Sequence, residues 1–527
     1  MSRIIRGVVA VLALSAPVAA LAGPKLDFDE FEWALAQNVA ADPGLAAFYG
    51  ANGLRPIFEG VDGAARRQAL VQAVASAPAH GLPVSRYSLP AAPAATDAAA
   101  RARAEAQEAR AAARWMRDLT GGVVDPQRVD PGIKREVRRP PLDGMLRDFI
   151  ASDDPVGYLT GLGPKDPRYA QLQAALGAKA GLVAPADAPL APEVLLRPGE
   201  SSPQVADLRA RLASIGFTAD SPDPQLYDQP LRDAVAAYQQ AAGLAADGIS
   251  GPATARRLNG GFDRSQRGIL LALERMRWMG DADPMARQVW VNIPEFKTQI
   301  LDGGQQVFDT RVVVGKVDEE LQTPEFSDLM EYVVVNPRWN VPRSITVREY
   351  LPRLKANRNA VSHIDIVDSR GRKIDRSSID FSKYTEANFP YRMQQQPSDD
   401  NALGIVKFIF PNPWNIYLHD TPSKGLFSHN SRAYSHGCVR VGDPVDLATQ
   451  LLSRQTDNPR GMFDRALAGG NERWLKLDPP LPVHLVYFTT FPDETGRLRT
   501  YPDIYNRDGK LWQALSRAGL ESGGAEG

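Results

Sequence analysis

Residues 415–441 read NIYLHDTPSKGLFSHNSRAYSHGCVRV, and this stretch holds the single cysteine of the chain, Cys438. It also holds three of the six histidines, His419, His429 and His436. A cysteine nucleophile needs a base or a positive setting to form the thiolate, a group that orients the base, and donors for the oxyanion of acyl transfer. His419 and His436 are both candidate bases, so the segment indicates nucleophilic catalysis through Cys438.

Two neighbours of Cys438 suit this chemistry. Gly437 has no Cβ, so backbone amides can come close to a bound oxyanion. Arg440 lies two residues on, on the same side of an extended chain, and adds positive charge. The general alternative for a lone cysteine is an inert buried residue. A structural zinc site usually has four ligands with paired spacing, and the segment has no CxxC, so we predict neither a metal site nor a cofactor. The remaining histidines are interpreted as structural, namely His80, His363 and His484.

Two motifs in this stretch resemble those of the L,D-transpeptidases of the YkuD type. Residues 435–440 (SHGCVR) look like the family's cysteine signature, and residues 417–421 (YLHDT) look like its first histidine motif. The separation of 19 residues between His419 and Cys438 also fits. Residues 335–342 (VNPRWNVP) resemble the large periplasmic subgroup typified by YcbB, which combines a scaffold, a peptidoglycan-binding-like domain and a catalytic domain with a capping insertion.

The resemblance implies a reaction on peptidoglycan stem peptides. Cys438 would attack the L,D bond after the third residue of a tetrapeptide stem, D-Ala would leave, and a thioester would form. The side-chain amine of another stem would then attack, giving a 3→3 cross-link. His419 would be the general base, oriented by the backbone carbonyl of Asp420. His436 would support the loop or donate a hydrogen bond, and the amides of Gly437 and Cys438 would form the oxyanion hole.

The resemblance also suggests which residues hold the substrate, and it leaves the acceptor open. The candidates for substrate binding are Arg440, Tyr417, Trp339 and Ser435, although a tyrosine or tryptophan of the core would look the same. Water as acceptor would make the protein an L,D-carboxypeptidase, and a protein amine would make it a protein-to-wall attachment enzyme. A wall-binding protein without catalysis is a further alternative, and a papain-like protease a weaker one. Carbapenems are expected to acylate Cys438.

The rest of the chain suggests a multidomain α+β protein. Residues 24–190 have helical patterns and are expected to form a helical scaffold. A Pro- and Ala-rich linker at 182–194 precedes residues 196–260, which resemble a type-1 peptidoglycan-binding domain of three helices. Residues 261–500 have the alternation of short strands, sandwich-like or barrel-like, and form the expected catalytic domain. Its capping insertion is placed at about 343–403, and residues 501–527 are interpreted as a tail.

Composition and the N-terminus bear on the compartment and on partners. The 527 residues include 61 Lys and Arg against 62 Asp and Glu, which argues against nucleic acid as the main partner. Residues 1–22 combine Arg3 and Arg6, a short apolar stretch and a small-residue site at 20–22, the layout of a secretory signal peptide. The sequence therefore predicts export to the periplasm, no stable membrane span after cleavage, and peptidoglycan, with possible other wall-synthesis proteins, as partners.

Overall fold

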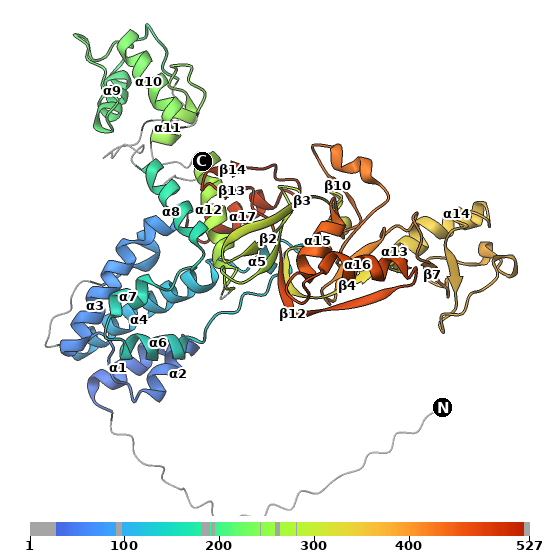
Figure 1. Cartoon of the computed structure of the whole chain (residues 1–527). Helices are drawn as coiled ribbons and strands as arrows, with labels where there is room; N and C mark the ends of the chain where they lie inside the picture. The colour runs from blue at the N-terminus through green and yellow to red at the C-terminus, as the bar shows by residue number, and fades with distance from the viewer. Residues whose placement is uncertain are drawn as a thin grey trace, which may run out of the picture.

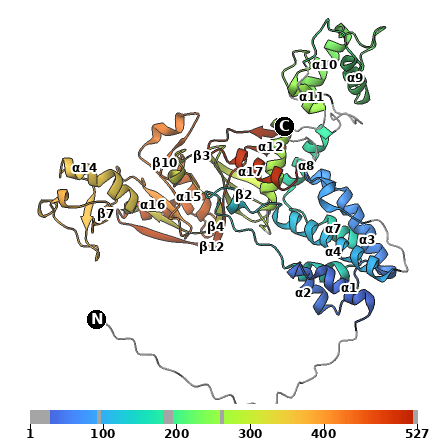
Figure 2. The same cartoon turned by 180° about the vertical axis from the view of Figure 1, so that it is seen from behind.

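The computed structural model describes residues 28–90, 97–180, 190, 195–242, 244–258, 264–280 and 282–520. Figure 1 shows a helical region, a three-helix unit that stands away from it, and an elongated β-rich part. The view from behind shows the same separation (Figure 2). The predicted signal peptide and most of the predicted linker lie outside the described residues. No helix among the described residues is long and apolar enough to cross a membrane.

The N-terminal region is helical, as predicted. Its central helix, α4, is capped by Asp97 and buries Trp115 and Met116. The helical spacing of apolar residues from Leu26 to Val39, Phe28 among them, predicts a first helix over this range. The helix begins instead at Glu30, because Asp29 and Glu32 form a capping box there, and Phe28 lies before it and is exposed. The helices are α1 (Glu30–Val39), α2 (Pro43–Ala51), α3 (Gly60–Ala75), α4 (Ala98–Gly121), α5 (Pro126–Val129), α6 (Leu142–Ala151), α7 (Pro155–Thr160) and α8 (Pro167–Ala180).

The three-helix unit has the predicted order. It consists of α9 (Pro203–Ser214), α10 (Gln229–Ala241) and α11 (Pro252–Leu258) around a core of its own. Ser202 stands at the N-cap of α9, but its hydroxyl makes no capping bond, contrary to the sequence expectation. Asp228 does cap α10, through the amide of Leu231.

The β-rich part is built around one sheet that closes on itself. Its strand order is β10-β3-β11-β9-β8-β4-β12-β1-β2, and β2 also pairs with β3. The predicted barrel-like arrangement is therefore the one observed. The strands are β1 (Gln288–Asn292), β2 (Lys297–Asp302), β3 (Gln305–Gly315), β4 (Phe326–Val335), β8 (Val406–Ile409), β9 (Leu418–His419), β10 (Ala433–Ser435), β11 (Val439–Val441) and β12 (Arg473–Val486).

Helices cover the outside of this sheet. The alternation at residues 288–293 predicts one buried face, but every residue of β1 is buried. Val289 and Val291 face the interior, whereas Trp290 packs with residues of α8 and of α12 (Arg264–Arg277). Residues of α15 (Pro444–Leu452) and α16 (Pro459–Ala468) pack in the interior cluster with Val289 and Val291, and β13 (Thr490–Pro492) and β14 (Leu498–Thr500) form a separate two-stranded sheet. Asp443 was expected to cap α15, but its carboxylate accepts a bond from Thr310 instead.

The insertion has its own small fold and core. A three-stranded sheet of order β5-β7-β6 packs with short helices, at the end of the molecule opposite the helical region (Figure 1). The Gln-rich stretch at 393–396 was expected to be a loop, but most of it forms β7, where alternate residues are buried. The elements are β5 (Trp339–Asn340), α13 (Arg343–Ile345), a π-helical turn (Thr346–Tyr350), α14 (Leu351–Ala356), β6 (Asp365–Val367) and β7 (Arg392–Gln395).

The C-terminal segment is part of the folded protein, so its interpretation as a tail is wrong for residues 501–520. Residues Arg507–Arg517 form α17, whose Leu511 and Leu515 are buried against the helical region. Arg507 is fully buried and forms an ion pair of 2.8 Å with Glu325. Apolar residues at helical spacing after residue 506 were the sequence signal for this helix.

Candidate active site

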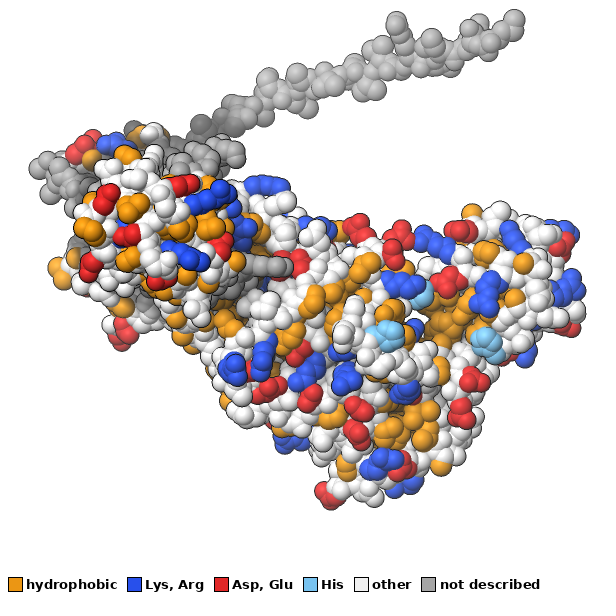
Figure 3. Space-filling model, turned by 90° about the horizontal axis from the view of Figure 1, so that it is seen from above, with side chains coloured by type: hydrophobic (Ala, Val, Ile, Leu, Met, Phe, Trp, Pro, Cys, Tyr) orange, Lys and Arg blue, Asp and Glu red, His pale blue; other side chains and the backbone are white. Residues whose placement is uncertain are grey.

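A cavity of about 1070 Å³ opens at the junction of the closed sheet and the insertion. Four of the predicted site residues line it: Tyr417, His436, Gly437 and Cys438. The base of the insertion contributes Arg338 and residues 340–344, and the loop before β4 contributes Glu319, Glu320, Gln322 and Pro324. Figure 3 shows histidine side chains gathered around a hollowed part of one face. The other predicted site residues are not part of the lining, namely His419, Asp420, Ser435, Arg440 and Trp339.

The loop between β10 and β11 carries the nucleophile. Gly437 has a φ of +109°, and this backbone conformation requires a glycine directly before Cys438. The Ser435 hydroxyl accepts a bond of 3.2 Å from the Gly437 amide and donates to the Cys438 carbonyl. Ser435 therefore fixes the turn, and it is not part of the cavity lining. The Cys438 thiol lies 3.6 Å from the carbonyl oxygen of Asn415.

The structure corrects half of the predicted oxyanion hole. The Gly437 amide is already bonded to Ser435, so it is not a spare donor. Among the described residues, none accepts a hydrogen bond from the Cys438 amide. The Cys438 amide is therefore free to donate to a developing oxyanion.

His419 is held behind the nucleophile by the sheet. β9 and β11 are parallel neighbours with His419 opposite Arg440, and Tyr417 O accepts from Val439 N at 3.1 Å. The His419 Nδ1 bonds to the carbonyl oxygen of Asp420, as expected. The Asp420 carboxylate accepts from Ile405 N at 3.0 Å and from Lys424 Nζ at 2.5 Å. Both the side chain and the backbone carbonyl of Asp420 are therefore held by hydrogen bonds.

Burial decides the protonation of the pair. The pKa of His419 is lowered to about 3, first by burial and then by the charge of Arg440. The pKa of the Cys438 thiol is raised to about 11 by burial, although Tyr417 and Arg440 act to lower it. Near neutral pH both groups are therefore uncharged, and the thiol must lose its proton as it reacts.

Tyr417 lines the cavity, as a substrate-binding residue would, whereas Trp339 lies behind it. The Tyr417 hydroxyl interacts with both the Cys438 thiol and the Trp339 side chain, and burial followed by the sulfur raises its pKa well above the usual value. Trp339 is buried in the core of the insertion, edge-on to Tyr350. It therefore supports Tyr417 from behind and is not placed to contact a substrate in the cavity.

His436 connects the nucleophile loop to the insertion. Its Nε2 lies 2.7 Å from a carboxylate oxygen of Glu349, in the π-helical turn. Arg440 is half-buried, and its charge acts on both His419 and Cys438. His429, the third histidine of the segment, is exposed and bonds to the Tyr434 hydroxyl at 3.2 Å.

Three groups of residues contribute to the site but were not predicted from the sequence. Pro131, Gly132 and Lys134 of the helical region reach the cavity, and Lys134 N donates to Glu325 O at 2.8 Å. The other two are Thr323, whose hydroxyl bonds to the Gly437 carbonyl, and Glu349. None stands in a motif, and each is far from residue 438 in the chain.

Three comparisons with family models agree with this architecture. Residues 286–460 match the model of the YkuD L,D-transpeptidase catalytic domain. Residues 43–176 match a scaffold domain, and residues 201–258 match a model described as "Putative peptidoglycan binding domain". These matches fall on the β-rich part, the helical region and the three-helix unit, respectively.

One curated protein and one solved structure are also similar. A Haemophilus influenzae protein described as "Putative L,D-transpeptidase" is 36% identical over 225 residues, which are 42% of this chain and 45% of that protein. The match thus spans less than half of the relative's length. The crystal structure of an L,D-transpeptidase (residues 123–326) from Xylanimonas cellulosilytica is 15% identical, with a TM-score of 0.15, and the match covers 57% of this chain and 100% of that one.

Proposed function

We propose that residues 286–460, which match the model of the YkuD L,D-transpeptidase catalytic domain, form 3→3 cross-links between peptidoglycan stem peptides, with Cys438 as nucleophile. The observation that carries the proposal is the arrangement of Cys438 at the wall of the cavity, with His419 fixed by the Asp420 carbonyl on the neighbouring strand. A thiol, a base of defined tautomer and an unoccupied amide are the parts that acyl transfer needs.

The first half-reaction forms the acyl-enzyme. The Cys438 sulfur attacks the carbonyl carbon of the third stem residue while its proton passes to Nε2 of His419. The negative charge that develops on the carbonyl oxygen is stabilised by the Cys438 amide. Collapse of this intermediate breaks the bond to D-Ala, whose amine takes the proton from His419, and a thioester remains.

The second half-reaction transfers the acyl group. The side-chain amine of a second stem attacks the thioester, the carbon–sulfur bond breaks, and the proton of the amine returns to the sulfur through His419. The cavity of about 1070 Å³ is at the upper end of the usual size range of ligand sites, which supports binding of a donor and an acceptor together. Water or a protein amine could take the place of the second stem.

The setting of the reaction is part of the proposal. We infer that residues 1–22 direct export and are removed, and that the protein works in the periplasm. The three-helix unit would hold the enzyme on its polymer, since residues 201–258 match a peptidoglycan-binding model. By the same acylation chemistry, carbapenems would react with Cys438.

Mass spectrometry of the products tests the proposal. The chain lacking residues 1–22 is incubated with a disaccharide-tetrapeptide, beside the Cys438→Ala variant. A cross-linked dimer that lacks one D-Ala, absent with the variant, is the expected product. Tripeptide alone would make the protein a carboxypeptidase. If neither a product nor an acyl-enzyme forms, with the disaccharide-tetrapeptide or with polymeric peptidoglycan, catalysis is contradicted and a wall-binding protein is favoured.

A further inference from the structure

Thr323 is a fully buried polar residue that bonds directly to the nucleophile loop. It lies in the connection between β3 and β4, and its exposed fraction is 0%. Its hydroxyl donates to the carbonyl oxygen of Gly437 at 2.8 Å and accepts from the amide of Gly315, also at 2.8 Å. The hydroxyl therefore joins the loop that carries Cys438 to the end of β3.

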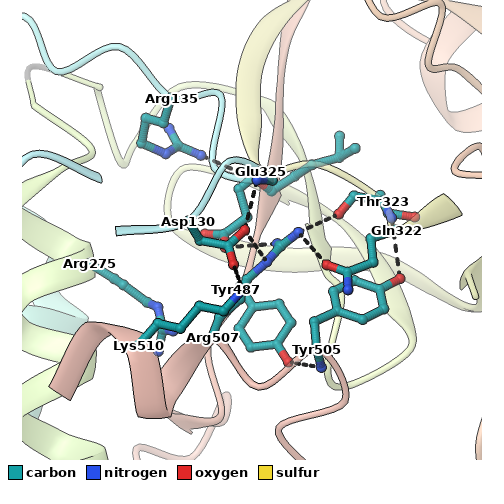
Figure 4. Close-up of polar contacts among 12 residues, drawn as sticks. Asp130, Arg135, Arg275, Gln322, Thr323, Glu325, Tyr487, Tyr505, Arg507 and Lys510 are labelled. Carbon is teal, nitrogen blue, oxygen red and sulfur yellow. Dashed lines mark hydrogen bonds and ion pairs between the residues drawn. The ribbon is translucent and has the colours of Figure 1, made fainter. Parts of the chain in front are cut away.

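The backbone of Thr323 is held equally firmly. Its amide donates to the Tyr505 hydroxyl at 3.2 Å, and its carbonyl accepts from Arg507 at 3.2 Å. The Tyr505 hydroxyl in turn donates to the carbonyl of Gly315 at 2.6 Å. Figure 4 shows Thr323, Tyr505 and Arg507 in this network. With both its side chain and its main chain bonded, Thr323 is a fixed point against which the loop is set.

The Arg507 side chain extends the network to the helical region. It pairs with Glu325 at 2.8 Å and lies 3.7 Å from Asp130, which also binds Lys510 at 2.5 Å (Figure 4). Asp130 comes from the segment after α5, whereas Arg507 and Lys510 come from α17. The position of Thr323 is thus defined jointly by the N-terminal region, the C-terminal helix and the sheet.

A bond to the Gly437 carbonyl has a geometric consequence for Cys438. The peptide unit is planar and trans, so its C=O and the N–H of the next residue point in opposite directions. Fixing the Gly437 carbonyl therefore fixes the direction of the Cys438 N–H. That N–H has no acceptor among the described residues, and Cys438 lines the cavity.

We propose that Thr323 is a positioning residue that aims the Cys438 amide at the oxyanion formed during acyl transfer. It touches neither substrate nor thiol in this role and acts through the peptide between Gly437 and Cys438. The inference rests on the proposed function, because the oxyanion arises in that reaction. A hydroxyl is required, and a methyl group in its place cannot orient the peptide.

Two reactions of the same sulfur separate this role from a structural one. Acylation by the disaccharide-tetrapeptide, followed as single-turnover release of D-Ala, passes through an oxyanion. Alkylation by iodoacetamide uses the same thiol but forms no oxyanion. We expect Thr323→Val to slow acylation roughly 10- to 100-fold, which is no more than the loss of an oxyanion donor costs. The rate of alkylation should stay within about twofold of that of the natural enzyme. Thr323→Ser, which keeps the hydroxyl, should acylate within a few-fold of the natural enzyme.

The outcomes distinguish the inference from its premise. Normal acylation by Thr323→Val, in an assay where the natural enzyme releases D-Ala, would overturn the role of Thr323 alone. A parallel loss of acylation and alkylation, or failure of Thr323→Ser to restore acylation, would mean a disordered loop and would also overturn it. A natural enzyme that is alkylated but releases no D-Ala would overturn the proposed function together with this inference. Melting temperatures of both variants show whether they fold.

Discussion

The ring of His419 bonds through Nδ1 to the carbonyl oxygen of Asp420, its neighbour in the chain. A carbonyl can only accept, so Nδ1 carries the proton and Nε2 keeps its lone pair. This tautomer is the one a general base needs. Because the pKa of His419 is lowered to about 3 and that of Cys438 is raised to about 11, the resting pair is neutral and not a thiolate with an imidazolium.

A neutral pair predicts how alkylation of Cys438 depends on pH. Iodoacetamide reacts with the thiolate, so its rate should rise about tenfold per pH unit from pH 6 to 9, with no plateau below the thiol pKa of about 11. The measurement is the rate of mass increase of the intact protein. A plateau with a midpoint below pH 7 would instead show a preformed ion pair.

His419→Ala should affect acylation far more than alkylation. Loss of a general base costs about 10²–10⁴-fold in rate, because the proton of the thiol then has no acceptor as sulfur attacks. Alkylation at pH 9 does not need this acceptor and should change little. The matched control is His429→Ala, an exposed histidine of the same segment. Equal effects of the two variants on acylation would contradict the assignment of His419.

Cys438→Ala should abolish cross-linking with little loss of stability. The variant deletes one sulfur from a half-buried side chain at the wall of a cavity, so few packing contacts are lost. We expect a change in the melting temperature of at most a few degrees, measured beside Val439→Ala. Val439 is fully buried in the sheet, so its truncation should cost about 1–3 kcal/mol. A larger fall for Cys438→Ala than for Val439→Ala would make the cysteine structural.

The sequence defines the nucleophile loop well because its determinants are local. Gly437, Cys438 and His419 lie in one short segment, and the residue types alone indicate the chemistry. Thr323 and Glu349 could not be found in this way. Each bonds to the loop across 114 and 87 positions of the chain, respectively, through a contact that only the folded chain creates.

The fold shows the same division between local and distant effects. Helix starts such as Asp228 before α10 follow from capping, and the three-helix unit has its predicted order. The apolar spacing after residue 506 indicates a helix, and the tail interpretation overlooked it; the burial of Arg507, in contrast, depends on Glu325, 182 positions away. The sequence around a charged residue does not indicate whether a distant carboxylate will form a buried ion pair with it.

The hydrogen bond between His436 and Glu349 is expected to restrain the motion of the insertion. We predict that the insertion is mobile and gates the cavity, and this exposed bond of 2.7 Å joins it to the nucleophile loop. Glu349→Gln should weaken the joint and increase amide hydrogen exchange at residues 343–356, with the sheet unchanged. Glu386→Gln, elsewhere in the insertion, is the control. Exchange in the insertion as slow as in β4, in both the natural protein and Glu349→Gln, would contradict gating.

Arg507→Ala tests whether the C-terminal helix is part of the core. The variant leaves the buried carboxylates of Glu325 and Asp130 without this partner, and breaking a buried pair costs about 3–5 kcal/mol. The melting temperature of the β-rich part, followed by tryptophan fluorescence, should fall by roughly 10 °C. Arg517→Ala, at the exposed end of the same helix, should have almost no effect. Similar melting temperatures for the two variants would restore the tail interpretation.

Buried histidines predict that the protein loses stability in mild acid. The pKa of His484 is lowered to about 3 by burial and by the charges of Arg135 and Arg168, that of His419 to about 3, and that of His80 to about 4. The unfolded chain has histidine pKa values near 6.5, so below this pH it binds protons that the folded protein does not.

Stability should therefore be full above pH 6.5 and fall as the pH drops toward 3. The three histidines together contribute a slope of at most about 4 kcal/mol per pH unit, one proton each. His484→Asn should remove up to about a third of this slope between pH 6 and 4, measured by urea unfolding at a series of pH values. His363→Asn, at an exposed position, is the control. An unchanged slope in His484→Asn would mean that this histidine is already protonated in the folded protein, and that its bond of 2.6 Å to Ser327 is made by a charged ring.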